Sequence, residues 1–429
     1  MNLKEIKKVY FLGIGGIGMS ALARYFKSLG AEVSGYDRTS TDLTNVLESE
    51  GIKIAFEDDL NLYPKEVDMV VYTPAIPKDH KGFNFYKDNN YNLKKRSEVL
   101  GIISADKFSI CVAGSHGKTT VSSMIAHILT HSGYGCSAFL GGIASNYNSN
   151  YLQSDNDVVV IEADEFDRSF HRLAPDMAVI TAVDTDHLDI YGSKENIDEA
   201  FIEFTHKISE EGFLVMKQGQ SINNSLPVLD KAFYSLQDSD ADVYCSKYWV
   251  VEGGYVFNIH YFGKEYIGFR LNIGGFHNIE NAIAAFTIAK ELNISIDKIK
   301  AALSSFTGIK RRFETVLKKE AVTFIDDYAH HPEEIRVLLE SVKEMFPDRK
   351  VTAIFQPHLF SRTKDLADGF AKALSIADEV LLLEIYPARE LPMEGVTSDL
   401  IFQKLTCKEK INTSKGAVVE LVKDKKIEV

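Results

Sequence analysis

The chain has 429 residues, and roughly 100–200 residues per domain indicate about three domains. A net charge of −13 without a dense basic run argues against binding to nucleic acid phosphates or to anionic membranes. The four cysteines form no CxxC pair, and no stretch reaches the ~20 apolar residues of a bilayer span. Since the N-terminus also lacks the apolar core of a signal peptide, we expect a cytoplasmic protein.

The first segment alternates predicted strands and helices. Residues 8–12 are predicted to form a strand, followed by a glycine turn, a helix over 19–29 and a second strand over 32–35. A third buried strand is expected over 68–72. Strands that alternate with helices predict a parallel sheet covered on both faces.

The same pattern restarts twice along the chain. We predict strands over 109–113, 157–161 and 177–183, with a second glycine loop and a helix over 119–132 after the first of them. After residue 313 we predict strands over 322–325, 351–355 and 379–383 and helices over 332–345 and 363–374. The predicted fold class is therefore α/β, with domains over residues 1–106, 107–314 and 315–429.

The first glycine turn is a candidate diphosphate site. Gly13, Gly15 and Gly18 fit the pattern G-x-G-x-x-G between a strand and a helix, with Gly16 inside it. Such glycines let the backbone approach a pyrophosphate, and the helix N-terminus supplies amide donors. Asp37 follows at the spacing of a ribose-binding acid. NAD, another diphosphate such as a UDP-sugar, and a tight turn without ligand all remain open here.

The second glycine loop predicts ATP binding. It follows a buried strand and opens a helix, so that its backbone amides can surround phosphates. Its glycines stand closer together than in the standard Walker spacing. Lys118 would reach the β- and γ-phosphates, and the Thr119 hydroxyl would bind Mg²⁺. The loop comprises Gly114, Ser115, His116, Gly117, Lys118, Thr119 and Thr120.

Two predicted strands of the second segment end in acidic residues. Glu162 ends one of them, and carboxylates at a strand end beside phosphates are ligands that Mg²⁺ favours. His187 follows the next strand, where it is either a metal ligand or a hydrogen-bonded structural residue. A ligase that binds a nucleotide-linked substrate in one domain and ATP in the next explains both glycine turns. An NAD-dependent oxidoreductase and a non-enzymatic nucleotide sensor are the alternatives from other classes.

In this order the motifs resemble the Mur ligases of peptidoglycan synthesis, over nearly the whole chain. The string Gly13–Ser20 is similar to the UDP-binding turn of the branch that adds L-alanine, and residues 162–165 and 186–189 resemble the family's metal-binding segments. The resemblance implies a Rossmann-like UDP-sugar-binding domain, a P-loop ATPase-like central domain and a Rossmann-like C-terminal ligase domain. It implies UDP-N-acetylmuramate and L-alanine as substrates, ATP with Mg²⁺ or Mn²⁺, and a monomer or weak homodimer. The tripeptide-recycling branch is the nearest alternative.

The resemblance also implies site residues. Its catalytic side chains are Lys118, His187, His330 and Arg362, and its metal ligands are Thr119, Glu162 and His187. Its UDP-sugar site comprises Gly13, Gly15, Gly16, Gly18, Asp37 and Thr73. To the ATP loop it adds His277, Asn278, Asn281, Arg312 and Asp327.

The chain departs from the family pattern at several positions. Leu359 replaces an arginine common in the alanine-adding branch, which leaves Arg362 to bind the alanine carboxylate. Ala200 and Phe201 lie where ligases that add later residues carry a modified lysine, and this favours the alanine-adding branch. We expect a strand over 426–429 and a C-terminal domain that stops short of the family's usual end.

Overall fold

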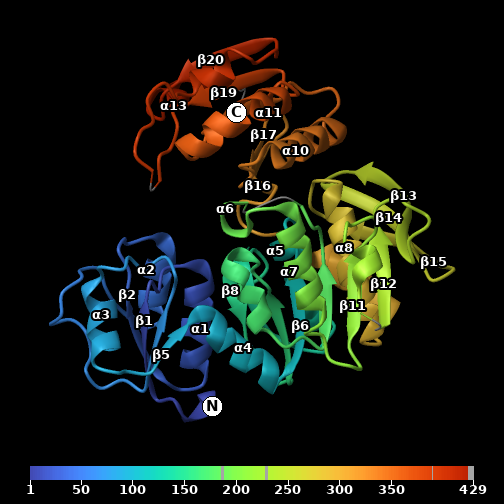
Figure 1. The fold of residues 1–429 in the computed structure, drawn as a ribbon. Helices are drawn as coiled ribbons and strands as arrows, with labels where there is room; N and C mark the ends of the chain where they lie inside the picture. Colours follow the sequence, from blue (N-terminus) through green and yellow to red (C-terminus); the bar gives the residue numbers. More distant parts are fainter. Residues whose placement is uncertain (185–187, 228–229, 389, 424–429) are drawn as a thin grey trace. The chain divides into compact units, whose positions relative to one another are not determined.

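The structure, a computed structural model, describes residues 1–184, 188–227, 230–388 and 390–423. The chain divides into two compact units. Unit 1 contains both predicted glycine turns and comprises Met1–Lys247, Asn258–Phe269 and Glu280–Thr307. Unit 2 comprises Tyr248–Phe257, Arg270–Ile279 and Gly308–Val429. Figure 1 shows the elements of both. The predicted residue 187 and the strand expected over 426–429 lie outside the described residues.

The first sheet of unit 1 is wholly parallel. Its strands lie in the order β3 (Lys53–Ala55), β2 (Glu32–Tyr36), β1 (Lys8–Leu12), β4 (Met69–Tyr72) and β5 (Leu93–Lys95). Val9 and Phe11 are buried in one cluster, and Tyr10 and Leu12 in another. Burial on both faces explains the continuous apolar strand. The helices are α1 (Ile17–Ser28), α2 (Asp42–Ser49), α3 (Lys81–Asp88) and α4 (Arg96–Asp106), after η1 (Leu3–Glu5).

The predicted ATP loop follows β6 (Phe108–Ala113), a strand of the second sheet. From one edge this sheet reads β8 (Ser149–Leu152), β7 (Ser137–Ala144), β9 (Val158–Glu162), β6, β10 (Met177–Ile180), β11 (Phe213–Lys217) and β12 (Asp230–Ser235). β8 runs antiparallel to β7, whereas the pairs from β7 to β12 are parallel. β13 (Val243–Val251), β14 (Gly254–Tyr261) and β15 (Lys264–Leu271) continue the order, and their residues 243–247, 258–261 and 264–269 belong to unit 1.

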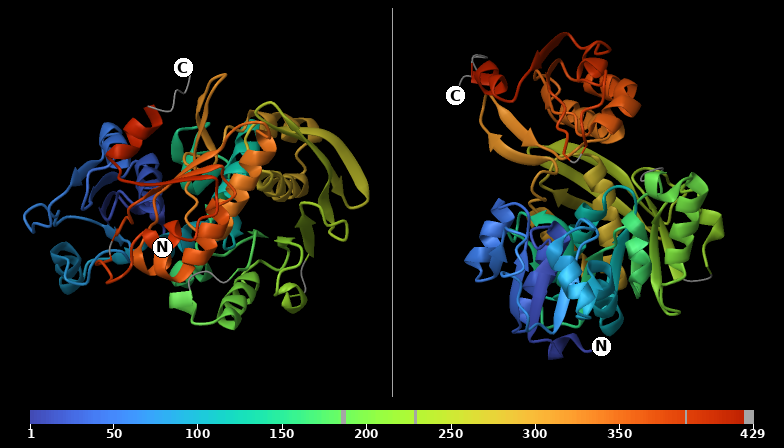
Figure 2. Two further views of the ribbon diagram at one scale, coloured as in Figure 1. Left: turned by 90° about the horizontal axis from the view of Figure 1, so that it is seen from above. Right: turned by 60° about the vertical axis from the view of Figure 1, so that its left-hand side comes forward.

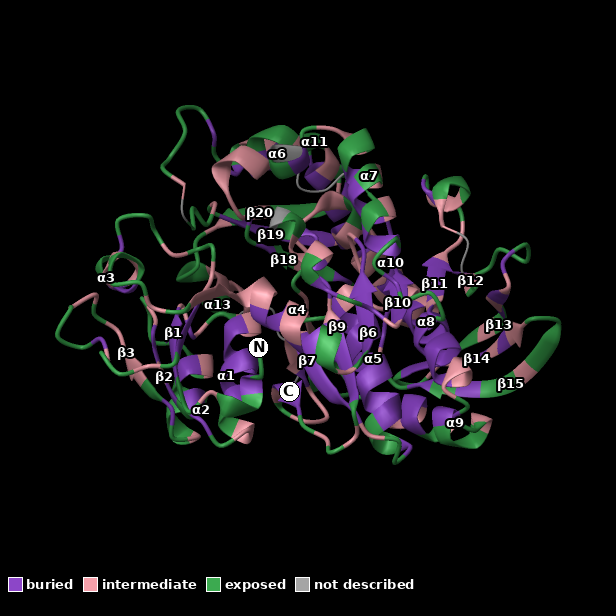
Figure 3. Cartoon of the chain, turned by 60° about the horizontal axis from the view of Figure 1, so that its bottom comes forward, coloured by how far each residue is buried: buried purple, intermediate pink, exposed green. Residues whose placement is uncertain are grey.

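Helix α5 (Lys118–His131) is the centre of this second core. Its residues from Thr119 to Leu129 are all buried, and Figure 3 shows α5 and the strands β6 and β9 in the buried colour. A helix that is buried on every side is typical of the interior of a large domain. The remaining helices are η2 (Phe166–Arg172), α6 (Leu188–Tyr191), α7 (Lys194–Thr205), η3 (Asn223–Ser225), α8 (His277–Glu291) and α9 (Ile296–Ser305).

Unit 2 has a small parallel sheet of its own (Figure 2). The strands β18 (Thr352–Phe355), β19 (Glu379–Leu383) and β20 (Glu409–Thr413) are parallel, and β16 (Glu314–Lys318) pairs antiparallel with β17 (Thr323–Asp326). Side chains of β19 share one core with Leu339 and Phe370. Those two residues lie on α10 (Pro332–Met345) and α11 (Phe360–Leu374), and α12 (Asp399–Phe402) and α13 (Ala417–Lys423) follow.

These sheets confirm the predicted α/β class. The strands predicted over 8–12 and 379–383 and the helix over 332–345 agree residue for residue with β1, β19 and α10. The strand predicted over 177–183 ends at Ile180, and beyond it the amide of Val183 donates to the side chain of Gln220 at 2.7 Å and not to a neighbouring strand. The helix predicted over 363–374 starts earlier, at Phe360. Within the described ranges, no helix is both long and apolar enough to cross a membrane.

Candidate active site

The first glycine turn brings its predicted residues together at the carboxyl end of β1. Gly13 has a φ of +86°, and a Cβ built on it would lie 2.6 Å from Cγ2 of Thr73. The amide of Gly15 donates to Oδ2 of Asp37 at 2.7 Å. Gly16 is the N-cap of α1. In this structure Asp37 therefore stabilises the turn through the amide of Gly15, and its role toward a ribose stays a prediction.

Gly18 faces a residue that the sequence analysis did not identify. A Cβ built on Gly18 would lie 2.4 Å from Nη1 of Arg96, so a side chain there would displace the guanidinium. Arg96 is the first residue of α4, directly after β5. One feature of the sequence could have indicated Arg96. It belongs to a basic run, Lys94–Arg96, where a strand meets a helix on the same sheet edge as the glycine turn.

The ATP loop joins β6 to α5 and is fixed by the end of β10. Gly114 has a φ of +132°, and a Cβ on it would lie 2.2 Å from Oγ1 of Thr181. Gly117, with a φ of +83°, is the N-cap of α5. The hydroxyl of Ser115 accepts a hydrogen bond from the amide of Asp184 at 2.9 Å. Positive φ values and close approaches explain why both loop positions are glycine.

Lys118 lies in an enclosed, acidic environment. Its Nζ donates to the carbonyl of Gly114 at 2.6 Å and pairs with both carboxylate oxygens of Glu165, at 2.9 and 2.8 Å. Burial alone would lower the pKa of Lys118, but Glu165, with Glu162 nearby, raises it on balance. Burial raises the pKa of Glu165, against the effect of Lys118. Glu165 lies in the predicted metal-binding segment, but nothing in its sequence spacing identifies it as the partner of Lys118.

Thr119 and Glu162 lie side by side, as the predicted metal site requires. The Thr119 hydroxyl donates to Oε1 of Glu162 at 3.1 Å, and Oε2 accepts the amide of Gly141 at 2.8 Å. Hydroxyl and carboxylate oxygens are the hard donors that Mg²⁺ prefers, so both side chains fit this ion. The third predicted ligand, His187, lies outside the described residues. Across the described ranges, no cluster of three His, Cys, Asp or Glu side chains could hold a metal.

Three of the residues that the resemblance adds to the ATP loop lie at the start of α8. Asn281 belongs to unit 1, and a Cβ on Gly117 would lie 2.9 Å from its Oδ1, which puts Asn281 against the ATP loop. His277 and Asn278 belong to unit 2. There the side-chain amide of Asn278 donates to the carbonyl of Gly274 at 2.6 Å. His277 is the first residue of the helix.

The remaining predicted residues lie in unit 2. Both carboxylate oxygens of Asp327 accept backbone amides, from Phe313 at 2.6 Å and Ala329 at 2.7 Å, so Asp327 fixes the chain around β16 and β17. Burial raises the pKa of Asp327, while these amides and the charge of Arg312 oppose the rise. Nδ1 of His330 lies 2.9 Å from the carbonyl of Tyr328. The predicted Arg362 lies in the first turn of α11.

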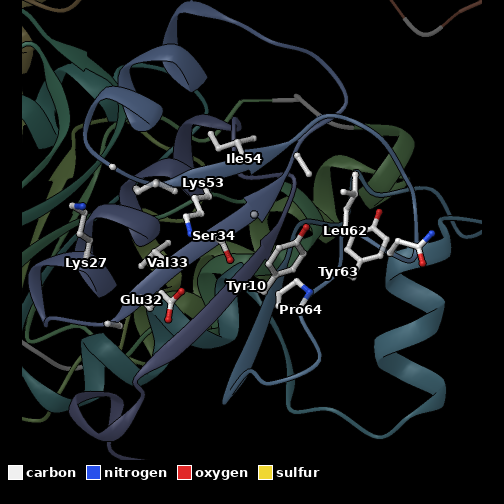
Figure 4. Close-up of a pocket in the computed structure, with 16 residues that line it drawn as sticks. Tyr10, Lys27, Glu32, Val33, Ser34, Lys53, Ile54, Leu62, Tyr63 and Pro64 are labelled. Atoms are coloured by element: carbon white, nitrogen blue, oxygen red, sulfur yellow. The ribbon is translucent and has the colours of Figure 1, made fainter.

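The first predicted domain also has a pocket, with a volume of ≈ 500 Å³, that none of the predicted site residues lines (Figure 4). Tyr10, Ser34 and Lys53 from three neighbouring strands line it, together with Leu62 and Tyr63. The described chain forms no helix between β3 and β4. This part of the sheet is therefore less covered, which accounts for the pocket.

The comparisons with known proteins cover this whole architecture. The family models for the Mur ligase catalytic domain, the Mur ligase middle domain and the Mur ligase glutamate ligase domain match residues 8–108, 112–289 and 311–426. A UDP-N-acetylmuramate–L-alanine ligase of Christiangramia forsetii is 46% identical over 435 residues, 100% of this chain and 94% of the relative. The ligase of that name from Flavobacterium johnsoniae is 48% identical over 410 residues, 95% and 90% of the two chains.

A solved structure agrees with these relatives. The crystal structure of the UDP-N-acetylmuramate–alanine ligase of Thermotoga maritima matches with a TM-score of 0.83 and 29% identity, over 97% of this chain and 93% of that one. A likeness that extends over the full length in both sequence and structure reflects common descent of all parts of the fold, and the chain therefore belongs to the Mur ligase family.

Proposed function

We propose that this chain uses ATP to join L-alanine to the carboxylate of UDP-N-acetylmuramate, a step in the synthesis of peptidoglycan precursors. Relatives 46% and 48% identical carry the name of that ligase. The structural observation that supports the proposal is the cluster of Lys118, Thr119 and Glu162, in which a cation and two hard oxygen donors lie within one loop and an adjacent strand end.

The first step transfers the γ-phosphoryl group of ATP to the muramyl carboxylate. The bond between the β- and γ-phosphates breaks, a P–O bond to the carboxylate forms, and the products are an acyl phosphate and ADP. Both reacting groups are anionic, so the step depends on charge neutralisation more than on proton transfer. Lys118 supplies a positive charge at the loop, and the amides at the start of α5 supply further donors.

Thr119 and Glu162 would hold Mg²⁺, which when bound lowers the charge repulsion between phosphate and carboxylate. The hydrogen bond between the two side chains, at 3.1 Å, keeps their oxygens in place for this role. His187 remains the predicted third ligand. Mn²⁺ also takes carboxylate and other oxygen donors, and we expect it to substitute.

In the second step the amine of L-alanine attacks the acyl carbon, and phosphate leaves from the tetrahedral intermediate. His330 is our proposed acceptor for the amine proton. A carbonyl oxygen only accepts hydrogen bonds, so the contact with Tyr328 at 2.9 Å requires the proton on Nδ1. Nε2 then carries the lone pair. We propose that Arg362, at the start of α11, binds the alanine carboxylate.

The other binding residues follow from the same proposal. The first glycine turn, with Thr73 and Asp37, would take the UDP-sugar, and His277, Asn278, Asn281 and Arg312 would take the adenine nucleotide. We propose a cytoplasmic monomer or weak homodimer, because ATP and UDP-sugar substrates are supplied in that compartment. The three-domain boundaries stay a prediction.

A phosphate-release assay tests the proposal. The full chain is incubated with ATP, Mg²⁺ and UDP-N-acetylmuramate, with either L-alanine or the tripeptide L-alanyl-γ-D-glutamyl-meso-diaminopimelate as amine. We expect phosphate release with L-alanine and a product that is heavier by one alanine residue. Release with the tripeptide alone would assign the chain to the recycling branch. No release with either amine, or binding of NADH, would refute the ligase function.

A further inference from the structure

We infer that Arg96 is a positioning residue that couples the UDP-sugar turn to the ATP site. Nη2 of Arg96 donates to Oδ2 of Asp164 at 2.8 Å, and the other guanidinium nitrogen faces Gly18. The side chain of Arg96 is 22% exposed, so its position is defined by these neighbours. The inference rests on the proposed function, since it concerns two substrates of that reaction.

On the side of the turn, Arg96 lies where a substrate anion is proposed to bind. Gly18 is the second residue of α1, and the N-terminus of a helix carries partial positive charge. A guanidinium beside that end adds to the positive potential there, and although Asp164 pairs with it on one side, the arrangement favours an anion at the turn. A diphosphate bound at the turn would supply that anion and would accept from both the helix amides and Arg96.

On the side of the ATP loop, Asp164 transmits the position of Arg96. Its Oδ1 accepts the amide of Phe166 at 3.1 Å, which starts η2, while its Oδ2 accepts from Arg96. The next residue in the chain is Glu165, the partner of Lys118. A shift of Asp164 caused by Arg96 would therefore also move Glu165, the adjacent residue, and with it the ion pair to Lys118.

The backbone of α4 is firmly held, so the coupling resides in the side chain of Arg96. The helix begins with a hydrogen bond from the amide of Lys95 to Oε2 of Glu98 at 2.7 Å. Further along, the hydroxyl of Ser104 accepts the amide of Ala174 at 3.0 Å, which ties α4 to the chain after η2.

The planar guanidinium has five donors and can serve both partners at once. A bound diphosphate would fix its rotamer and with it the segment from Asp164 to Glu165. ATP would then bind to a segment that is already ordered, so its binding would lose less conformational entropy. This gives positive cooperativity between the two substrates. By linkage, the effect of UDP-N-acetylmuramate on ATP binding equals the effect of ATP on UDP-N-acetylmuramate binding.

Titration calorimetry measures this coupling directly. The dissociation constant of a non-hydrolysable ATP analogue with Mg²⁺ is determined for the full chain with and without saturating UDP-N-acetylmuramate. In the wild type we expect the analogue to bind about five-fold tighter or more with the UDP-sugar present. In Arg96→Gln this factor falls below about two-fold. Arg96→Lys keeps the charge but lacks the planar fork, and it stays uncoupled.

Two further variants complete the design. Lys107→Gln removes the ion pair with Asp157 (2.7 Å) at the other end of α4, and this control keeps the wild-type coupling. Asp164→Asn keeps the acceptor for Phe166 but loses the charge that Arg96 binds, and it reproduces the loss seen in Arg96→Gln. If circular dichroism shows that Arg96→Gln does not fold, Asp164→Asn tests the coupling in its place.

Either of two results would overturn the inference: the same coupling in Arg96→Gln or Asp164→Asn as in the wild type, or no coupling in a wild type that ligates L-alanine. A wild type that releases no phosphate with L-alanine would instead overturn the proposed function, so the two failures are distinguishable.

Discussion

Substitution of Lys118 is expected to damage both folding and catalysis, and the structure allows the two effects to be separated. The side chains of Lys118 and Glu165 are 15% and 5% exposed. Removing one partner of a buried ion pair costs about 3–5 kcal/mol, because the other charge stays buried without compensation. Whole domains have free energies of unfolding of only about 5–15 kcal/mol. Lys118→Met alone would therefore lose activity partly through unfolding.

The double variant Lys118→Met/Glu165→Gln isolates the catalytic loss. It removes both charges, so we expect it to recover more than half of the stability lost in Lys118→Met. Its turnover should stay about 10³-fold below the wild type, equivalent to about 4 kcal/mol of barrier, because the γ-phosphate has lost its cation. Glu165→Gln is the control that retains Lys118 and the carbonyl of Gly114, which Nζ contacts at 2.6 Å in the native chain.

Urea unfolding followed by far-UV circular dichroism gives the stabilities, and phosphate release gives the rates. A double variant as unstable as Lys118→Met would show that the ion pair with Glu165 is not what Lys118 contributes to folding. A double variant that regains turnover would refute Lys118 as the phosphate-binding cation.

Three further outcomes are expected. Gly114→Ala should weaken ATP binding at least ten-fold by calorimetry, since its Cβ would meet Thr181. Gly133→Ala at the other end of α5 is the matched control: its φ of +79° strains alanine as well, but its Cβ meets open space, so we expect the folded variant to bind ATP normally. Burial, with a smaller effect of His131, lowers the pKa of His127 from 6.5 to about 4, so the unfolded chain takes up a proton that the folded chain does not. The free energy of unfolding should then fall by about 3 kcal/mol between pH 6.5 and pH 4, and urea titrations should show a smaller fall in His127→Gln. Removal of divalent metal with EDTA should abolish phosphate release and leave the circular dichroism spectrum unchanged, with activity restored by Mg²⁺.

The glycine turns were predictable because their signals are local. A strand, a run of glycines and a helix follow one another within about twenty residues at Gly13 and again at Gly114, and the steric reasons for glycine lie in the turn and its neighbouring strand ends. The proximity of Thr119 to Glu162 was predictable too. Both follow parallel strands of one sheet, whose carboxyl ends meet at the same edge.

Much of the chain between 205 and 310 was not assigned elements from the sequence. It forms the strands β11–β15 and the helices α8 and α9. Exposed positions interrupt the apolar pattern of β13 and β15, so their periodicity is weak. Their place at one end of the second sheet depends on tertiary pairing, which the residues themselves do not specify.

The missed site residues share one physical property: each acts through a charge partner distant in the chain. Arg96 pairs with Asp164 and Glu165 with Lys118, and neither pairing has a signature in sequence spacing. The stretch from Glu162 to Glu165 nevertheless receives donors from α4 and α5, which begin at different strand–helix junctions of unit 1. Its sequence indicated a metal-binding segment because acidic residues follow a strand. In the folded chain its carboxylates also bind Arg96, which lies against Gly18 of the first turn, and Lys118 of the second, so we expect a change at either residue to alter this one acidic segment.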